Sequence, residues 1–548
     1  MNRICGLMAA LALCWGAASQ ASAQTPGDEA DPALVEQQLR DEPPPPTSPR
    51  RPVTLPPTGE ASSALMRTVL AGAIRVDGAV VAEQSDFAAV VERYVGRTLG
   101  PADLRQLASD VAAVAHDLGY PLASARIPEQ RVANGVLRVE LDEGRIDSVE
   151  ISGGGRRAVE PILAALADGK PVRGAILERQ LLLAEDVAGV RLGKARLKRQ
   201  GGRNILAVST ARDRVVGRLS LDNWGTSTSG PFRARAGLQV NDLGTRGGRL
   251  ALDGVMTPFD LSEFALLRAT YRAPFGRSGS EAGVGGYVAR SETDGEAAPR
   301  NIDGRSSQIE ADLQHPLVRS RAFSLWVGLG GRFRESRLTR DEILIRDDRL
   351  AILSADLVLT SSHPKGRLRG GASVVRGFDL FGATERGDPL ASRSDAGGVF
   401  VKVQVWGDYE RRLGRKFSLM VLAEAQTADR PLLSSEEMGL GGRYFGRAWD
   451  YREFAGERGL AAAVELRFDL ERPAPKVTGV QIYSYVDAGT VESFGRGSRS
   501  LASAGGGLRL HLPKDIQASF ELGVPLTDGA EPARRDRPRF SLRLDKRF

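Results

Sequence analysis

The chain has 548 residues, 75 Lys and Arg against 68 Asp and Glu for a net charge of +7, and a mean hydropathy of −0.22. It is too long for one ordinary domain, and it has no apolar run of about 18 residues beyond the N-terminus, which excludes a helical membrane protein. Because Cys5 and Cys14 are its two cysteines and its four histidines are scattered, a disulfide framework and a Cys/His zinc site are also excluded. A membrane β-barrel remains compatible with the composition, since polar side chains that face its lumen lower the average hydropathy.

Residues 1–23 have the features of a secretory signal peptide. Arg3 precedes an apolar stretch, and Ala21-Ser22-Ala23 forms an A-x-A cleavage site. We therefore expect an exported chain that begins near Gln24 and contains no cysteine. The alternative is a lipoprotein attached through Cys14, whose neighbours on either side do not fit a lipoprotein site.

Residues 24–62 are expected to form a helix on a tether. Asp31 is a suitable N-cap, and Pro32 is a suitable first residue for a short helix that runs to Arg40. The proline run that begins at Pro43 predicts an extended, semi-rigid spacer. The helix is therefore attached to the rest of the chain without being embedded in a neighbouring domain.

Two small α/β units are expected next, in residues 63–145 and 146–212. Each alternates short apolar strands with helices whose apolar residues recur at helical spacing. In the first unit the pattern predicts a strand from 74 to 81, a helix from 101 to 118, and strands at 123–127 and 135–141. In the second it predicts a strand at 146–151, helices at 158–166 and 175–186, and strands at 190–192 and 205–208.

Residues 213–548 alternate apolar and polar side chains in many short segments separated by turn-rich stretches. Examples are 323–329, 401–405, 464–468, 508–512 and 520–524. This pattern predicts a closed transmembrane antiparallel β-barrel of about 16 strands. Phe548 ends the chain on the alternating phase. A soluble β-solenoid or sandwich array is the alternative, but the chain has no short internal repeat that would support it.

Several motifs are more specific than these patterns. The first α/β unit contains Gly119-Tyr120, Ile127-Pro128-Glu129-Gln130 and Glu143-Gly144-Arg145-Ile146, the second contains Leu177-Glu178-Arg179, and the barrel begins near Asp222-Asn223-Trp224-Gly225 and Ser229-Gly230. Residues 427–460 contain Gly441-Gly442, Phe445-Gly446-Arg447-Ala448-Trp449 and Gly456-Glu457-Arg458-Gly459. With these motifs, almost the whole chain after residue 23 resembles the outer-membrane transporters of two-partner secretion, of the hemolysin secretion/activation and filamentous-hemagglutinin transporter type.

The resemblance implies that residues 427–460 are a loop folded back into the barrel. Its motif residues would be Gly441, Gly442, Arg447, Trp449, Gly456 and Gly459, and the barrel-wall partner of Arg447 would be Asp487. The family usually carries Val-Arg-Gly-Phe or Val-Arg-Gly-Tyr at this place, whereas this chain has Gly446-Arg447-Ala448-Trp449. The tetrapeptide Val375-Arg376-Gly377-Phe378 lacks the flanking glycines, and we expect it in a different loop. The alternative for Asp487 is a turn residue.

The same resemblance assigns roles to the other parts. The two α/β units would be periplasmic polypeptide-transport-associated (POTRA) domains, which recognise a partner exoprotein of adhesin or cytolysin type with Tyr120, Ile127, Pro128 and Gln130. The N-terminal helix would be a removable plug, and Phe548 would be the signal that the barrel-assembly machinery reads when it inserts the protein among outer-membrane lipids. The chain would act as a monomer that exports the exoprotein through its pore.

Other functions are disfavoured by the sequence. A barrel insertase is the main alternative, although such factors generally carry more POTRA domains. A passive porin or a barrel enzyme needs no tandem periplasmic modules, and no catalytic constellation, cofactor motif or metal-ligand set is visible. Nucleic acid is not expected as a partner, because no basic run is interleaved with aromatic residues.

Overall fold

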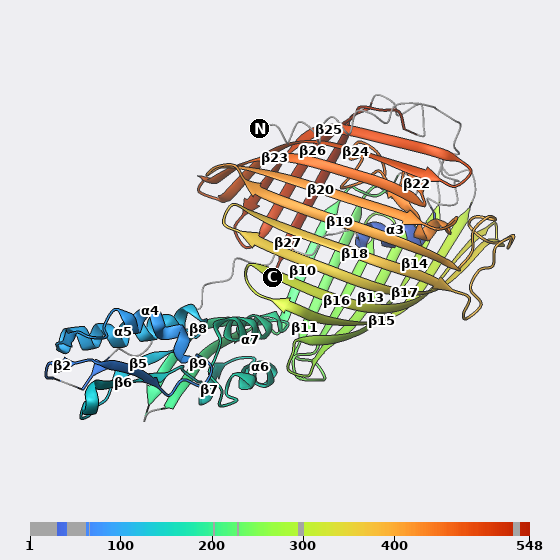
Figure 1. Cartoon of the computed structure of the whole chain (residues 1–548). Coiled ribbons are helices and arrows are strands. Elements are labelled where there is room, and N and C mark those ends of the chain that lie inside the picture. The colour runs from blue at the N-terminus through green and yellow to red at the C-terminus, as the bar shows by residue number, and fades with distance from the viewer. Residues whose placement is uncertain are drawn as a thin grey trace.

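The computed structural model describes residues 30–40, 62–64, 66–200, 203–226, 230–293, 301–529 and 537–548. Figure 1 shows two small α/β domains beside a large β-barrel. The expected signal peptide, the spacer and Ser229 lie outside the described residues. No helix in the described part of the chain is long and apolar enough to cross a bilayer.

The barrel is a closed antiparallel ring of 16 strands, which confirms the predicted fold class. Each strand pairs with its neighbour in the ring, and β10 pairs with β27 to close it. The strands are β10 (Val215–Asp222), β11 (Arg233–Asn241), β12 (Arg249–Met256), β13 (Phe264–Phe275), β14 (Ser280–Thr293), β15 (Ile302–Arg319), β16 (Phe323–Arg340), β17 (Ile343–His363), β18 (Gly366–Phe378), β19 (Phe400–Arg412), β20 (Phe417–Ala428), β23 (Arg458–Ala474), β24 (Val477–Ser493), β25 (Gly497–Leu512), β26 (Ile516–Pro525) and β27 (Arg539–Arg547).

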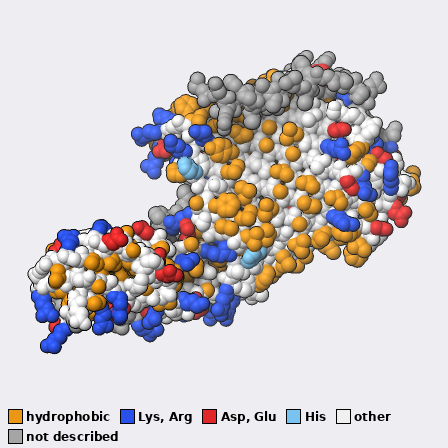
Figure 2. Space-filling model, in the orientation of Figure 1, with side chains coloured by type: hydrophobic (Ala, Val, Ile, Leu, Met, Phe, Trp, Pro, Cys, Tyr) orange, Lys and Arg blue, Asp and Glu red, His pale blue; other side chains and the backbone are white. Residues whose placement is uncertain are grey.

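The alternating pattern of the sequence separates the two faces of the wall. In β15, Ile309 and Leu313 are exposed on the outside, whereas Gln308, the residue before Ile309, is buried on the inside. Figure 2 shows the resulting band of apolar side chains over the barrel wall. Successive side chains of a strand point to opposite faces, so period-2 alternation places apolar groups toward lipid and polar groups toward the lumen.

The last residue takes part in closing the ring. Phe548 exchanges two backbone hydrogen bonds with Gly217 of β10, with N–H to O distances of 2.7 and 3.1 Å. Its side chain is exposed on the outer surface. The C-terminal residue therefore adds one more residue to the pairing of β27 with β10, which closes the barrel.

The connections at the two ends of the barrel differ in length. At the end beside the α/β domains they are short turns, such as 320–322 and 364–365. At the far end they include two long loops, residues 379–399 and residues 429–457, which we call the infolded loop. The long segments therefore gather at the end away from the α/β domains.

The first α/β domain has a sheet in the order β1-β5-β6-β3, covered by helices. Its elements are β1 (Ser62–Ser63), β2 (Val69–Leu70), β3 (Ala73–Asp77), η1 (Gln84–Phe87), α4 (Ala88–Glu92), β4 (Thr98–Leu99), α5 (Pro101–Asp117), β5 (Ser124–Ile127), η2 (Ala133–Gly135) and β6 (Val136–Asp142). The expected strand through residue 81 is wrong beyond Asp77. The chain turns at Gly78, where φ is +88°, and Val81 is exposed with its N–H bonded to the Glu143 carboxylate.

The second α/β domain repeats the order strand, helix, helix, strand, strand. Its elements are β7 (Ser148–Gly153), α6 (Arg156–Leu163), η3 (Ala164–Leu166), α7 (Gly174–Asp186), β8 (Val190–Gln200) and β9 (Arg203–Arg212), and the sheet order is β7-β9-β8. Both helices bury an apolar face against the sheet. The predicted elements of this domain are therefore present, with shifted ends.

Helix α7 also docks on the barrel, as Figure 1 shows. The guanidinium of Arg319, at the end of β15, forms two hydrogen bonds to the carboxylate of Asp186, of 2.7 and 2.9 Å. Arg179 donates to the carbonyl of Pro316 across 2.8 Å. A paired, bidentate contact fixes orientation as well as distance, so the second α/β domain is held in a defined position beside the barrel.

Candidate functional site in the barrel lumen

A short helix lies inside the barrel. Helix α3 (Pro32–Arg40) is surrounded by wall strands, as Figure 1 shows. Its N-terminus is capped as the sequence predicts, because the Ala33 N–H donates to Oδ1 of Asp31 across 2.8 Å. The same carboxylate oxygen accepts the hydroxyl of Ser336 on β16 at 2.6 Å. The cap therefore also attaches the helix to the wall.

Polar side chains hold the helix on other sides. Glu36 is buried and forms an ion pair with Arg268 of β13. Gln38 accepts a hydrogen bond from Arg233 of β11, and its Nε2 donates to the carbonyl of Trp224 across 3.0 Å. Because Glu36 is buried, its charge needs Arg268 as a partner to be tolerated.

An apolar contact complements these bonds. Val35 packs against a buried group on the wall made of Val255, Phe264, Leu266, Tyr287 and Ala289. Ala30 packs against Ile302 and Leu338. The lumen is thus shaped to receive one face of this helix, although most of its lining is polar.

The infolded loop has a structure of its own. It contains η4 (Ser434–Glu436) and a small hairpin of β21 (Met438–Leu440) with β22 (Phe454–Gly456). Its apolar side chains form a cluster with the wall strands β23, β24 and β25, made of Met438, Leu440, Phe445, Trp449, Phe454, Ala461, Ala463, Val491 and Leu501. The loop is therefore packed into the barrel and not extended into solvent.

Glu436 anchors the loop to one side of the wall. It is 1% exposed and lies 2.8 Å from Nζ of Lys402, 3.2 Å from Arg332 and 3.3 Å from Arg334. Its backbone carbonyl accepts a further bond from Lys402 at 3.0 Å. One buried carboxylate thus connects the loop to both β16 and β19.

The neighbouring Glu437 connects the loop to the other long loop of the far end. It pairs with Arg393 of residues 379–399 at 2.6 Å and with Arg452 of its own loop at 3.3 Å. Arg393 also pairs with Glu457, whose carboxylate accepts the N–H of Phe494 at 3.0 Å. The two long loops are therefore joined by buried charges.

The motif glycines Gly441 and Gly442, together with Gly446, form the tight turn that precedes Arg447. Gly441 has φ of +106°, and a Cβ there would lie 2.0 Å from the carbonyl oxygen of Asp450. Gly446 has φ of +72°, a conformation that residues with a side chain rarely adopt. The Gly442 N–H donates to the carbonyl of Trp449 at 3.2 Å and closes the turn.

The other two motif glycines allow close packing on the wall. A Cβ at Gly456 would lie 2.6 Å from the carbonyl of Glu492, and one at Gly459 would lie 2.7 Å from the sulfur of Met438. Both distances are too short for carbon. Gly441 and Gly442 therefore shape the turn before Arg447, and Gly456 and Gly459 lie where the loop meets the wall.

Arg447 reaches a cluster of carboxylates on the wall. Its Nη1 donates to Glu521 at 3.1 Å and to Glu465 at 3.2 Å, and its guanidinium carbon lies 4.2 Å from the centre of the Tyr485 ring. The side chain is buried. Glu465 is shared with Arg467 and Arg509, at 2.6 and 2.7 Å. Arg447 is therefore part of a network of charges and not of one pair.

Asp487 lies in this network, but its strongest bonds are elsewhere. Its carboxylate lies 3.8 Å from Nε of the Arg447 guanidinium. Its Oδ1 accepts the Gly446 N–H at 2.7 Å, and both of its oxygens accept the Ser503 hydroxyl. The Gly446 N–H and the Ser503 hydroxyl bind the carboxylate oxygens, so the ion pair of Asp487 with the Arg447 guanidinium is a single, longer contact. Asp487 belongs to β24, which removes the alternative of a turn residue.

The second copy of the tetrapeptide lies outside this site. Arg376 is in β18, so the expectation of a different loop is wrong. Its guanidinium carbon lies 5.1 Å from the centre of the Phe378 ring. The segment pairs regularly with β17 and β19 and takes part in the wall.

The residues expected to recognise cargo lie in the first α/β domain, and two of them are buried. The side chains of Tyr120 and Ile127 are 3% and 1% exposed in its core, so neither side chain can touch a partner in this conformation. Gln130 bonds to both backbone groups of Arg138 in β6, at 2.7 and 3.0 Å. Pro128 is half-buried. Tyr120 and Ile127 therefore contribute to the core of the domain.

Several lumen residues were missed by sequence reasoning. They are Glu36, Arg268, Arg332, Arg334, Arg393, Lys402, Glu437, Glu465 and Glu521, together with Glu436. One signal was available, because adjacent acids at 436 and 437 in a loop expected inside a barrel require cations nearby. Their partners lie on distant strands and have no signature of their own.

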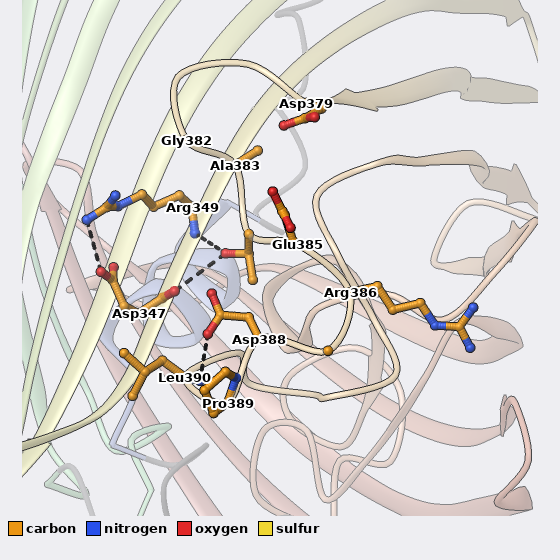
Figure 3. Close-up of a pocket in the computed structure, with 12 residues that line it drawn as sticks. Asp347, Arg349, Asp379, Gly382, Ala383, Glu385, Arg386, Asp388, Pro389 and Leu390 are labelled. Atoms are coloured by element: carbon orange, nitrogen blue, oxygen red, sulfur yellow. Dashed lines mark hydrogen bonds and ion pairs between the residues drawn. The ribbon is translucent and has the colours of Figure 1, made fainter.

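A polar hollow of about 600 Å³ lies where residues 379–390 fold over β17 (Figure 3). Arg349 pairs with Asp347 at 3.0 Å, and its N–H donates to the hydroxyl of Thr384 at 2.8 Å. The Thr384 hydroxyl also donates to the carbonyl of Asp347 at 3.4 Å, so these bonds hold the loop against β17. Among the described residues, no group of three or more His, Cys, Asp or Glu side chains is placed to hold a metal ion.

Comparison with protein families gives a direct match to this architecture. A family model described as haemolysin secretion/activation protein ShlB/FhaC/HecB matches residues 201–510, which is more than half of the chain. The chain belongs to this family. A second model, described as a POTRA domain of ShlB type, matches residues 71–144. As a member of the ShlB/FhaC/HecB family, the chain is an outer-membrane transporter of the two-partner secretion class, with its POTRA domain in the periplasm.

Individual relatives are distant but extend over most of the chain. The heme/hemopexin transporter protein HuxB of Haemophilus influenzae is 22% identical over 84% of this chain and 84% of its own length. The outer membrane transporter CdiB of Escherichia coli O6:K15:H31 is 23% identical over 93% of this chain and 88% of its own.

Solved structures show the same fold. CdiB from Escherichia coli has a TM-score of 0.75 at 20% identity, and covers 96% of this chain and 100% of its own. CdiB from Acinetobacter baumannii has a TM-score of 0.65 at 18% identity, and covers 96% and 99%. In this ShlB/FhaC/HecB transporter the α/β domains therefore mark the periplasmic end, and the infolded loop belongs to the extracellular end.

Proposed function

We propose that this transporter captures one exported exoprotein with its two periplasmic α/β domains and passes it outward after α3 has left the lumen. The observation that carries the proposal is the way α3 occupies the barrel. A nine-residue helix fills part of the lumen without belonging to the wall, and it is joined to the first α/β domain through residues 41–61. A segment of this kind is able to leave without unfolding the barrel.

The contacts of α3 support a reversible plug. Glu36, Gln38 and Asp31 contact the wall through charged or amide groups, all of which water or a passing chain can satisfy after the helix leaves. The apolar contact is confined to one face of the helix. The helix is therefore bound as a ligand is bound, by several moderate contacts.

We assign the remaining parts within the same proposal. The second α/β domain acts as a second POTRA domain, because it repeats the strand and helix order of the first. Arg447, supported by Asp487 and the four motif glycines, keeps the infolded loop in its working position. Phe548 at the barrel seam serves as the signal for the barrel-assembly machinery, which places the monomer among outer-membrane lipids.

Directionality has to come from the cargo. No nucleotide-binding loop is present in the sequence, and an extended chain that folds after it emerges is withdrawn from the return path. The family description includes activation as well as secretion, so we propose that cargo of the adhesin or cytolysin type gains activity during passage. Comparing the activity of the exoprotein in lysates and in culture fluid, at equal amounts, tests this part.

Deletion of the gene tests the main proposal against a barrel insertase. We expect one large exoprotein to disappear from the culture fluid and to return on complementation, with other outer-membrane barrels unchanged. If secretion continued while many barrels were depleted from the outer membrane, the transporter proposal would be replaced by the insertase alternative.

A further inference from the structure

The two edges of the sheet in the first α/β domain are closed in different ways. At the β3 edge, the side chain of Gln84 bonds to both backbone groups of Val76: Oε1 accepts the N–H at 3.3 Å, and Nε2 donates to the carbonyl. A side chain that satisfies these groups removes them from reach of another strand. The β3 edge is therefore blunted.

The opposite edge is covered by a short piece of the chain itself. Ser62 and Ser63 form β1 and pair in parallel with Arg126 and Ile127 of β5. The N–H of Ala64 donates to the carbonyl of Ile127 across 2.9 Å. These residues follow directly on the spacer, residues 41–61, that leads from α3. The end of the plug tether thus occupies the β5 edge.

This cover is short and brings no apolar side chain to the domain. β1 has only two residues, whereas β5 runs from Ser124 to Ile127 and β6 is longer still. Ser62 is exposed, and neither serine brings an apolar side chain to the domain core. A segment that paired along all of β5 would form more backbone bonds and add side-chain contacts. β1 is therefore replaceable by a longer strand.

The position that β1 occupies is suited to an extended segment. It lies beside β5 at the sheet edge and against helix α5, which contacts both β1 and β5. In β5, Ala125 and Ile127 point into the core while Arg126 is exposed, so the edge itself is rigidly supported. Strand addition at an exposed sheet edge beside a helix is a general mode of peptide recognition.

We propose that the β5 edge is where an extended segment of the exoprotein adds as a strand, and that β1 holds this edge at rest. The inference rests on the proposed function. It identifies β5 as the edge to which the cargo binds and β1 as the strand that covers this edge before the cargo arrives. Capture of the cargo displaces β1 and, because β1 continues into the tether, it frees the tether of α3 in the same step. Cargo recognition and release of the plug are thereby linked.

A disulfide lock tests this exchange. Ser62→Cys with Arg126→Cys joins β1 to β5 at a matched position of the register. The chain has no cysteine after Cys14, so no competing disulfide is expected in the mature protein. The control is Ser152→Cys with Ser209→Cys, which joins β7 to β9 inside the second α/β domain.

With β1 locked, secretion of the exoprotein should fall at least about tenfold relative to the same protein after reduction with dithiothreitol, because the binding-competent state is no longer populated. The control pair should secrete equally in both states, and the amount of barrel in the outer membrane should be the same throughout. Equal secretion by the locked and reduced proteins would overturn the inference.

Ala64→Pro provides the opposite test, since it removes the N–H that bonds to Ile127. We expect amide exchange in Ser124–Ile127 to accelerate and secretion to stay the same or increase. Loss of secretion with a normal amount of inserted barrel would mean that β1 is a structural strand, which would also overturn the inference. If the reduced, unlocked protein exported no exoprotein at all, the proposed function itself would fail, and this result is distinct from the other two.

Discussion

Nη1 of Arg452 donates to Oε1 of Gln37 across 3.3 Å, and this contact joins the infolded loop directly to helix α3. The same guanidinium donates to the carbonyls of Glu437 and Ser434, at 2.9 and 2.8 Å, which hold it within the loop. Loop and helix are therefore parts of one obstruction, and a change in this contact should alter how often the helix leaves.

The first prediction uses the two directions in which Gln37 can be changed. Gln37→Ala removes the contact with Arg452 and should make channel openings more frequent, by a factor of about five to ten for a hydrogen bond worth about 1 kcal/mol. Gln37→Glu places a carboxylate opposite Arg452 and should make openings rarer. Single-channel recording in planar bilayers measures both. If both variants changed the opening frequency in the same direction, the contact would not hold the plug.

The second prediction concerns the ion pair of the buried Glu36 with Arg268, whose side chain is 21% exposed. Loss of one partner costs about 3–5 kcal/mol in a fully buried pair and less where water reaches one of the groups, so in Glu36→Ala the occupancy of the lumen by α3 should fall by about one order of magnitude or more. Openings should become frequent or permanent in bilayer recordings. The double variant with Arg268→Ala should recover part of the occupancy, because the unpaired charge is then removed too. Additive effects of the two changes would contradict a direct pair.

The third prediction separates the partners of Arg447. Arg447→Ala should reduce secretion strongly while the barrel still inserts, because Glu465 and Glu521 lose a buried cation. Arg447→Lys should restore little, since an ammonium cannot serve two carboxylates and stack on Tyr485 as the planar group does. Secretion assays with the amount of inserted barrel as reference measure this. Full secretion by Arg447→Ala would remove the residue from the mechanism.

Glu521 and Asp487 give a finer distinction within the same network. Because the Arg447 guanidinium donates to Glu521 at 3.1 Å and lies 3.8 Å from Asp487, Glu521→Gln should weaken the hold on this guanidinium more than Asp487→Asn does. Asp487→Asn should instead loosen the turn at Gly446, whose N–H it accepts. Limited proteolysis of the infolded loop reports the second effect, and secretion reports the first. A stronger secretion defect for Asp487→Asn than for Glu521→Gln would contradict this geometry.

The barrel was predictable from sequence, whereas the arrangement of its lumen was not. The alternation that defines a strand such as Phe323–Arg340 is local, and each residue reports its face through its own polarity. The pair of Glu36 with Arg268 joins residues far apart in the chain, and nothing near either one indicates the other. Charges inside a polar lumen have many permitted partners, so only the closed fold selects among them.

The site around Arg447 also shows that the sequence predicts which residues come together but not the bonds they make. The resemblance placed Arg447 and Asp487 in one site, and both lie there. It did not reveal that Gly446 and Ser503 take the oxygens of Asp487, because these bonds depend on the position of the turn against β24 and β25. In the first α/β domain, the motif at residues 127–130 begins with Ile127. The burial of this side chain follows from its place in β5 and from the contact of β5 with helix α5.

The last prediction tests the joint between the second α/β domain and the barrel. Arg319 binds Asp186 through two bonds, and Leu183 of α7 lies against the turn at Gly279, so the joint combines a charged and an apolar contact. Asp186→Arg should repel Arg319, loosen the domain and lower secretion several-fold, with barrel insertion unchanged. The charge-swapped double variant Asp186→Arg with Arg319→Asp should recover part of the secretion. Protease accessibility of α7 in isolated membranes should rise in the single variant and fall again in the double variant. If the double variant were no better than the single one in both measurements, the pair would not be what holds the domain in place.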